Sequence, residues 1–250
     1  MRRHGLRLVL LCVLTASQPL RAEPVDPDNP SCPLAPDWST NLEMRFRVLD
    51  RPGERPVLVG QGAIDANLIP RLEAALATFR GSEIWLQSPG GDARIGNQAG
   101  TLIRERGLST RIPAGWACAG ACAFMFLGGL SRIVEPEGVY VLEMFTFTGN
   151  REAIHREFAR GDQASADLLT NVALRSARLA TEDNDFLIRM GVSRALLTEI
   201  VYRQRAVPTA AGGPTRRCLT QAELRRYNVM NGDQRIGPGE SPEPLPTMQK

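Results

Sequence analysis

LQSPGGD, residues 86–92, and CAGACAF, residues 118–124, are the two stretches that decide the fold of this chain. In the first, a short apolar run ends in a Ser-Pro-Gly-Gly turn. In the second, Gly120 stands just before another apolar run. Each pattern predicts a strand that ends in a tight turn and leads into a helix. Glycine lets the backbone pass close to a bound group, so these two turns are where a functional site is expected.

On both sides of these two stretches, hydrophobic periodicity predicts strands and helices in alternation. The expected strands are residues 44–49, 56–60 with 62–64, 83–87, 109–112, 132–134 and 139–145. The expected helices are residues 65–79, 93–106 and 121–127, the first capped by Asp65. The buried face of that first helix is expected to carry Leu68, Leu72, Ala75, Leu76 and Phe79. This repeated order predicts an α/β spiral, with a doubly wound open sheet as the alternative.

The second half of the chain reads as mainly helical. A helical stretch is expected over residues 150–190, followed by a helix over 193–203 that Ser193 caps and a loop over 208–214. The candidate core positions of the long stretch are Ile154, Phe158, Leu168, Leu169, Val172 and Leu179. Thr220 and Glu223 form a capping box, which predicts a short helix to about residue 227.

The N-terminus has the pattern of an export signal. Arg2, Arg3 and Arg7 precede a short apolar run, and a small-residue cleavage site ends at Ala22. An uncleaved anchor is the alternative, but the run is shorter than the roughly 18 residues that span a bilayer. The expected organisation is a signal peptide at 1–22, an extended lead-in at 23–43, one domain at 44–232 and a disordered Pro-rich tail at 233–250. A periplasmic or secreted location follows from this prediction.

The basic charge of the chain lies mostly in that signal. Residues 1–22 hold four arginines and no acidic residue, so their removal lowers the formal charge from +3 to −1. The remaining arginines are interspersed with Asp and Glu. This distribution argues against a nucleic-acid partner, which would require a basic face.

Four cysteines remain after cleavage, namely Cys32, Cys118, Cys122 and Cys218. An even number in an exported chain predicts two disulfides, for which three connectivities exist. We favour Cys118 with Cys122, which would lie one helical turn apart, and Cys32 with Cys218, which would join the two ends of the domain.

The two turns resemble those of the Clp protease proteolytic subunit and the wider crotonase-like superfamily. In that family a strand enters an S-P-G-G turn, and a later strand carries G-x-A-x-S-x-G with the nucleophilic serine at the start of the next helix. The resemblance covers roughly residues 84–229. It implies an α/β fold of the ClpP/crotonase-like type, a spiral of β-β-α units with a helical C-terminal part.

The same resemblance implies a degenerate catalytic triad. Matched position by position, the nucleophile falls on Gly120, the histidine at or near Leu142, and the acid near Arg216 or Arg217. The mature chain contains one histidine, His155, which the pattern places on an exposed helical face. In the C-terminal stretch where the acid of the triad would lie, the acidic residues are Glu199 and Glu223. A serine-lysine dyad is not expected either, because the one lysine of the chain, Lys250, is the last residue of the tail. Peptidase activity is therefore not expected.

Other groups could carry chemistry beside the vacant position. Cys118 or Cys122 could act as a nucleophile, although a disulfide is the more expected state in an exported protein. Glu143 lies where the family histidine is expected, and crotonases use glutamates. A thiol-disulfide exchanger is disfavoured, because the spacing is C-x-x-x-C rather than C-x-x-C.

What the resemblance preserves is an oxyanion hole. It would consist of the N–H groups of Gly91 and Ala121, with Gly90 allowing close approach of a carbonyl. The sequence therefore predicts a catalytically silent protein that binds extended peptide or acyl ligands or acts as a scaffold. The alternative is an acyl-handling enzyme or hydrolase that uses Cys118, Cys122 or Glu143. No cofactor and no metal are expected, and the relatives' assemblies suggest a homo-oligomer.

Overall fold

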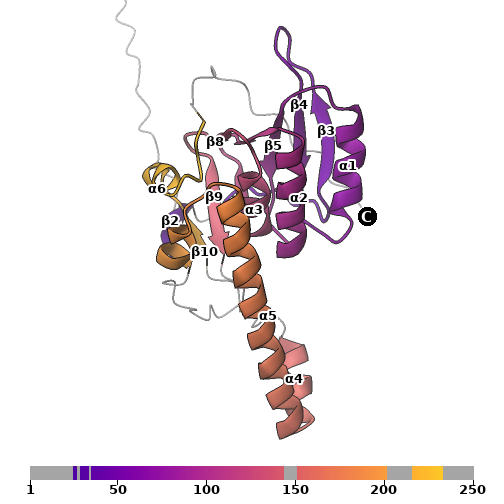
Figure 1. The fold of residues 1–250 in the computed structure, drawn as a ribbon, viewed down its shortest axis with the longest axis vertical. Helices are drawn as coiled ribbons and strands as arrows, with labels where there is room; N and C mark the ends of the chain where they lie inside the picture. The colour runs from indigo at the N-terminus through magenta and orange to yellow at the C-terminus, as the bar shows by residue number, and fades with distance from the viewer. Residues whose placement is uncertain (1–24, 27–28, 34, 144–150, 202–215, 233–250) are drawn as a thin grey trace, which may run out of the picture.

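The computed structural model describes residues 25–26, 29–33, 35–143, 151–201 and 216–232. The expected signal peptide, the loop at 208–214 and the tail with Lys250 lie outside these residues. Where the chain is described, it forms a mixed α/β structure with two main sheets and a long helical arm (Figure 1). The α/β class predicted from the sequence is thus confirmed.

The larger sheet has five strands, whose spatial order follows the chain. They are β3 (Arg45–Leu49), β4 (Val57–Gln61), β5 (Glu83–Gln87), β6 (Ser109–Ile112) and β8 (Arg132–Val134). β3 pairs antiparallel with β4, and every later pair is parallel. The order never reverses along this sheet, so the alternative of a doubly wound sheet is wrong.

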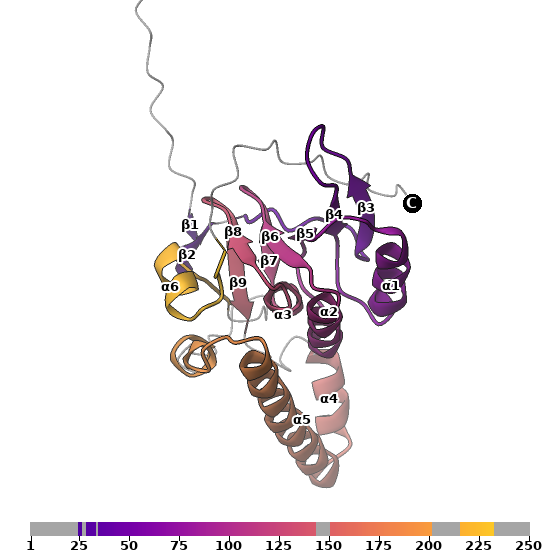
Figure 2. The same cartoon turned by 45° about the horizontal axis from the view of Figure 1, so that its top comes forward.

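Three helices cover one face of that sheet (Figure 2). They are α1 (Leu68–Thr78), α2 (Ala93–Glu105) and α3 (Ala121–Leu127). α2 and α3 pack closely because glycines leave no side chain between them: a Cβ on Gly96 would meet the carbonyl oxygen of Ala121, and one on Gly100 would lie 2.8 Å from that of Phe124. The core forms between these helices and the fully buried strands.

The cap of α1 differs from the expectation. Asn67 is the N-cap residue and its side chain makes no capping bond. The carboxylate of Asp65 instead accepts from the backbone N–H of Asn67 at 2.7 Å and binds the Arg71 guanidinium, which holds its pKa below the usual range. The apolar face is confirmed, because Leu68, Leu72, Leu76 and Phe79 are buried and Ala75 packs against the core.

A second sheet has three strands in the order β10-β9-β7. They are β7 (Ala117–Ala119), β9 (Val139–Glu143) and β10 (Arg216–Cys218). Beside it lies a hairpin of β1 (Val25–Asp26) and β2 (Asn29–Pro33), which the Cys32–Cys218 disulfide joins to β10. The other disulfide joins Cys118 to Cys122. The favoured connectivity is therefore confirmed.

The predicted helical stretch is a protruding helix pair. α4 (Arg151–Ala159) and α5 (Asp162–Arg189) are separated by a turn at Gly161, and α5 extends well beyond the sheets (Figure 1). The six candidate core positions of this stretch are wrong: Phe158 is 51% exposed, Leu169 is 62% exposed, and the other four are only partly buried. Helical periodicity was present, but only the last turns of α5, with Phe186 and Leu187, reach the core.

The C-terminal part ends in two short helical elements. Leu196–Val201 is a π-helix rather than an ordinary helix, and the hydroxyl of Ser193 accepts from the N–H of Ala195. α6 (Gln221–Arg226) begins at the expected capping box, in which Thr220 and Glu223 bond each other's backbone N–H groups.

Candidate functional site

The Ser-Pro-Gly-Gly turn and the Gly120 turn lie in direct contact. Ser88 donates its N–H to the carbonyl oxygen of Ala117 at 2.9 Å and accepts from the N–H of Ala119 at 3.0 Å. A Cβ on Gly90 would stand 2.7 Å from the carbonyl oxygen of Ala119 and 3.4 Å from the nitrogen of Ala121. The two stretches that resemble a peptidase scaffold thus form one corner.

Gly120 has a backbone conformation that disfavours any side chain. Its φ of 52° and ψ of −115° lie in a region essentially reserved for glycine. Its N–H donates to the carbonyl oxygen of Val141 at 3.1 Å, and its own carbonyl oxygen accepts from the N–H of Ala123 at 3.0 Å. Strand β7 therefore turns sharply into α3 at this residue.

Glu143 faces the space that a side chain at position 120 would occupy. Its Oε2 lies 2.8 Å from the position of a Cβ built on Gly120. Burial raises the pKa of Glu143 to about 7, against a smaller opposing effect from the Arg216 guanidinium. Arg216 pairs with Glu143 in the β9–β10 register. The corner thus contains a carboxyl group that changes its protonation state near neutral pH.

Leu142, in contrast, points away from the corner. It is 1% exposed and belongs to the main hydrophobic core together with Tyr140, whereas Val141 packs with Ala119 in the other cluster. The alternation of side chains along β9 therefore directs Glu143, not Leu142, toward Gly120.

Two backbone amides at the corner have no acceptor among the described residues. The N–H of Asp92 and the carbonyl oxygen of Gly90 both bond Ile64, which fixes the backbone on either side of Gly91. In a parallel ladder the residue between two such bonds directs its own N–H to the opposite side. Gly91 is exposed there, and the second amide is that of Ala121, the first residue of α3.

The remaining candidates have structural partners. Cys118 and Cys122 are buried and joined to each other, so neither thiol is free in this state. The hydroxyl of Ser88 accepts from the N–H of Gly90 at 3.1 Å, and that of Thr110 donates to the carbonyl oxygen of Phe126 at 2.7 Å. Ser88 thus stabilises its own turn, and Thr110 joins β6 to α3.

The other titratable candidates lie away from Gly120. His155 is exposed on α4, and α4 lies at the far part of the arm (Figure 1). Glu199 accepts from the Tyr227 hydroxyl at 2.7 Å, and Glu223 binds Arg217 while it caps α6. None of these three groups contacts Gly120 or Glu143.

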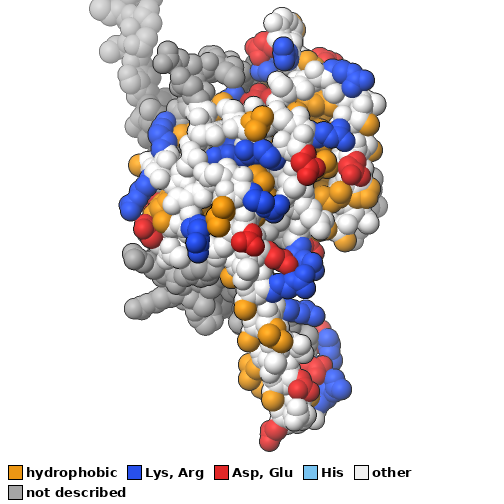
Figure 3. Space-filling model, in the orientation of Figure 1, with side chains coloured by type: hydrophobic (Ala, Val, Ile, Leu, Met, Phe, Trp, Pro, Cys, Tyr) orange, Lys and Arg blue, Asp and Glu red, His pale blue; other side chains and the backbone are white. Residues whose placement is uncertain are grey.

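A groove of about 580 Å³ begins at the corner and lies between the start of α2 and the middle of α5. It is lined by Gly91, Asp92, Ala93, Arg94, Arg175, Arg178, Leu179 and Glu182. Figure 3 shows Lys and Arg side chains gathered beside this part of α5. These arginines were not predicted from the sequence as site residues, although Arg175, Arg178 and Glu182 follow one another at helical spacing.

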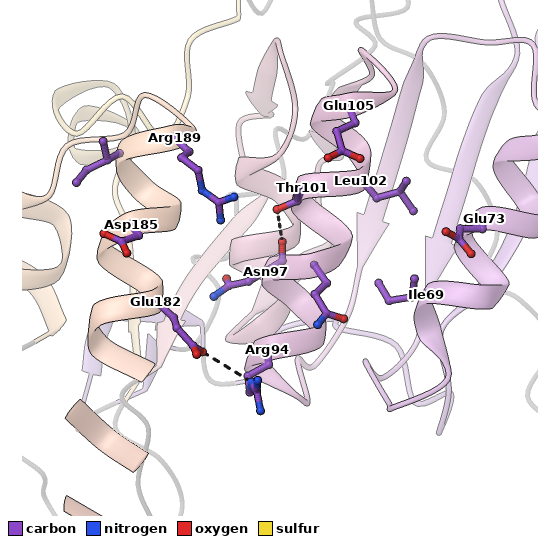
Figure 4. A pocket seen from close by; sticks show the side chains of 12 residues that line it. Ile69, Glu73, Arg94, Asn97, Thr101, Leu102, Glu105, Glu182, Asp185 and Arg189 are labelled. Carbon is purple, nitrogen blue, oxygen red and sulfur yellow. Dashed lines mark hydrogen bonds and ion pairs between the residues drawn. The ribbon is translucent and has the colours of Figure 1, made fainter. Parts of the chain in front are cut away.

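A larger groove of about 880 Å³ lies over α2, between α1 and α5 (Figure 4). Glu73, Glu105, Glu182 and Asp185 line it, with Arg94 and Arg189. The Asn97 side chain donates to Asp183 at 2.9 Å, and burial raises the pKa of Asp183 to about 6. This groove contains none of the corner residues.

The described part of the chain holds no group of three or more His, Cys, Asp or Glu side chains arranged to bind a metal ion. Within the same residues, no helix has the length and apolar character required to cross a bilayer.

Comparison with known proteins finds likeness among solved structures alone. No family model matches the chain, and no curated protein matches it. Among solved structures, the chain is similar to a mutant of ClpP1 from Listeria monocytogenes, with a TM-score of 0.44 and 13% identity. The match covers 71% of this chain and 92% of that one.

Proposed function

We propose that this protein is an exported, catalytically silent relative of the Clp protease and crotonase-like proteins, which binds an extended peptide or acyl ligand at the Gly90–Gly120 corner. The observation that carries the proposal is the contact of the two glycine turns, in which the amides of Gly91 and Ala121 have no acceptor among the described residues and Gly120 offers no side chain. Such a pair of donors is suited to a carbonyl oxygen.

The absence of peptidase chemistry follows from the groups at the corner. Gly120 has no nucleophile, the nearest titratable side chain is the carboxyl of Glu143, and both flanking cysteines are in a disulfide. Loss of a triad costs about 10⁶ in rate. A turnover of about 10 per second would then fall to roughly one per day. Binding is the function that remains.

The mode of binding follows from the backbone of Gly91. Its N–H is directed away from Ile64, to which the flanking peptide groups are bonded. An extended segment laid along Gly91 would continue this ladder by main-chain hydrogen bonds. The ligand's carbonyl group would enter between Gly91 and Ala121.

The test is binding of fluorescein-labelled β-casein, an unfolded protein, to the chain from residue 23 onward, followed by fluorescence anisotropy. Ala121→Pro removes the Ala121 N–H at the first helical position, where proline is tolerated. Asp162→Pro is the matched control, because it makes the same change at the start of α5 and also follows a glycine with positive φ. We expect at least a tenfold loss of affinity for Ala121→Pro and none for Asp162→Pro.

Labelling separates binding from relocated catalysis. We expect that a fluorophosphonate does not label a single residue stoichiometrically with loss of an activity. After mild reduction, we expect the same of iodoacetamide. Casein should also remain intact after prolonged incubation with the protein. Equal binding by both proline variants, or casein degradation that a fluorophosphonate stops, would show the proposal to be wrong.

A second function is favoured by one specific observation, the position and pKa of Glu143. A carboxyl with a pKa of about 7, next to two amides for which the described part of the chain provides no acceptor, has the properties of a general acid or base beside an oxyanion hole. We infer that, if the corner has an activity, it is hydration or hydrolysis of an acyl thioester that depends on Glu143. Turnover of crotonyl or acetyl thioesters that Glu143→Gln abolishes would establish this function in place of the silent one.

A further inference from the structure

We propose that the groove between α2 and α5 selects acidic peptides, with Arg175 as the group that binds a carboxylate of the ligand; this inference rests on the proposed binding at the corner. The groove is continuous with the corner because Gly91 is part of its wall. A segment bonded to the Gly91 amide would therefore extend along the groove.

The charges in the groove leave Arg175 available. Its wall contains three arginines and two carboxylates. The carboxylate of Glu182 lies 2.7 Å from Arg178 and 3.7 Å from Arg94, so these two arginines share one partner. Among the described residues, Arg175 has neither a hydrogen bond nor an ion pair, and it is exposed.

The other carboxylate of the groove, that of Asp92, does not neutralise Arg175. Asp92 uses its Oδ1 to accept from the N–H of Arg94 at 2.9 Å and from that of Ile95 at 3.1 Å, as the N-cap of α2. Its negative charge is thus committed to its own helix. Considering the described residues alone, the guanidinium of Arg175 is left unpaired in a groove of about 580 Å³, a volume in the range of ligand sites.

The ligand class follows from this geometry. A guanidinium presents planar donors that match a carboxylate in two parallel hydrogen bonds. Arg175 and Arg178 lie nearly one turn apart on α5, so they face the same segment of a bound chain. An extended peptide with acidic side chains would offer partners to both while its backbone bonds Gly91.

The experiment compares two fluorescein-labelled decapeptides, one alternating Thr and Glu and the other alternating Thr and Gln, by anisotropy at low salt. We expect the acidic peptide to bind about fivefold tighter or more. Arg175→Gln should abolish that preference without lowering the affinity for the neutral peptide. Arg156→Gln, at an exposed arginine of α4 on the arm, is the matched control and should leave the preference unchanged.

The possible outcomes separate the selection of acidic peptides from the proposed binding at the corner, on which it rests. Equal binding of both peptides, or an acidic preference that Arg175→Gln does not reduce, overturns the acidic selection but leaves the corner as a binding site. Binding of neither peptide to the wild-type chain overturns both, and an unaltered thermal unfolding curve for Arg175→Gln shows that its effect is local.

Discussion

Glu143 is the residue whose protonation state defines the chemistry of the corner. Burial favours its neutral form, and Arg216 opposes this only in part. A neutral carboxyl can donate a hydrogen bond to a ligand carbonyl, whereas the ionised form can only accept. The corner should therefore change its ligand preference near neutral pH.

The raised pKa of Glu143 also makes stability depend on pH. Between the ordinary value of 4.5 and about 7, the folded protein binds more protons than the unfolded chain, so stability falls as pH rises. We expect the free energy of unfolding to drop by at most about 3 kcal/mol from this group between pH 5 and pH 8. Urea unfolding at the two pH values measures it.

Glu143→Gln should remove that part of the pH dependence. Asp183, whose pKa is raised to about 6, contributes with the same sign at lower pH, and Asp183→Asn is the control that separates the two. An identical loss of stability in the wild type and in Glu143→Gln would contradict the buried carboxyl at the corner.

Gly120→Ala tests whether position 120 must be empty. The left-handed backbone alone costs about 1–3 kcal/mol for a residue with a side chain, and the new Cβ would stand 2.8 Å from Oε2 of Glu143. Gly53→Ala is the matched control, since Gly53 has φ +77° and open space around it. We expect Gly120→Ala to destabilise more than Gly53→Ala, measured by chemical unfolding, and a cost equal to that of Gly53→Ala would show that Glu143 does not occupy the space.

The sharp turn at Gly120 was predicted from one motif, and the carboxyl group beside it only in part. The resemblance to Clp proteases predicted that the position of their catalytic histidine falls at or near Leu142. The position could not be assigned more closely, because strand boundaries read from a sequence are uncertain by a residue. Since side chains alternate along a strand, that one residue decides whether a group faces the core or the corner.

At the scale of elements, the strands and helices of the first half were predicted closely, whereas in the second half the helices were predicted but the burial of their side chains was not. β5, β6, α2 and α3 combine strong apolar patterns with clear turns, so local and tertiary preferences agree. α5 has a helical pattern but protrudes, and its partly exposed leucines looked like core positions. Whether an amphipathic helix finds a partner surface is a tertiary property that periodicity does not contain.

The short strands β7 and β10 were not predicted, for a related reason. β7 and β10 have three residues each and depend on β9 between them. Their pairing is long-range, so no local pattern signals it. The arginine-lined groove was missed likewise, because it joins α2 and α5 across many residues of chain.

Arg132 is the side chain that attaches the end of α6 to β8. It is 1% exposed and donates to the carbonyl oxygens of Val229 and Asn228, each at 2.8 Å. Burial lowers its pKa to about 10, so it stays charged at neutral pH. We expect Arg132→Leu to destabilise by about 3 kcal/mol or more, because buried carbonyls lose a charged donor.

Arg225→Leu is the control for that change, since Arg225 lies on the exposed surface of α6 and makes one long hydrogen bond, at 3.4 Å. Its effect on thermal unfolding should be small. Similar costs for the two variants would mean that Arg132 does not attach α6 to the sheet.

At the scale of the whole molecule, the two disulfides have different roles. Cys32–Cys218 closes a loop with a sequence separation of 186, whereas Cys118–Cys122 closes one of only 4. Loop-closure entropy predicts stabilisation of about 5 kcal/mol for the first and about 2 kcal/mol for the second. The long-range bond thus links the N-terminal hairpin to the second sheet.

Paired Cys→Ser variants measure this difference by urea unfolding under non-reducing conditions. The Cys32→Ser/Cys218→Ser protein should lose more stability than the Cys118→Ser/Cys122→Ser protein. The reverse order would indicate that the short disulfide, which spans the Gly120 turn, holds the corner by native-state geometry rather than by chain entropy.

The central claim is that a ligand binds at the meeting point of the two glycine turns without covalent chemistry. The most direct measurement is a titration of the ¹⁵N-labelled chain from residue 23 with the two decapeptides, followed by amide NMR. The account predicts that the Gly91 and Ala121 amide resonances shift most, in the direction of stronger hydrogen bonding, and that the peptide remains intact. Saturable binding that leaves both amides unchanged, or cleavage of the peptide, would contradict it.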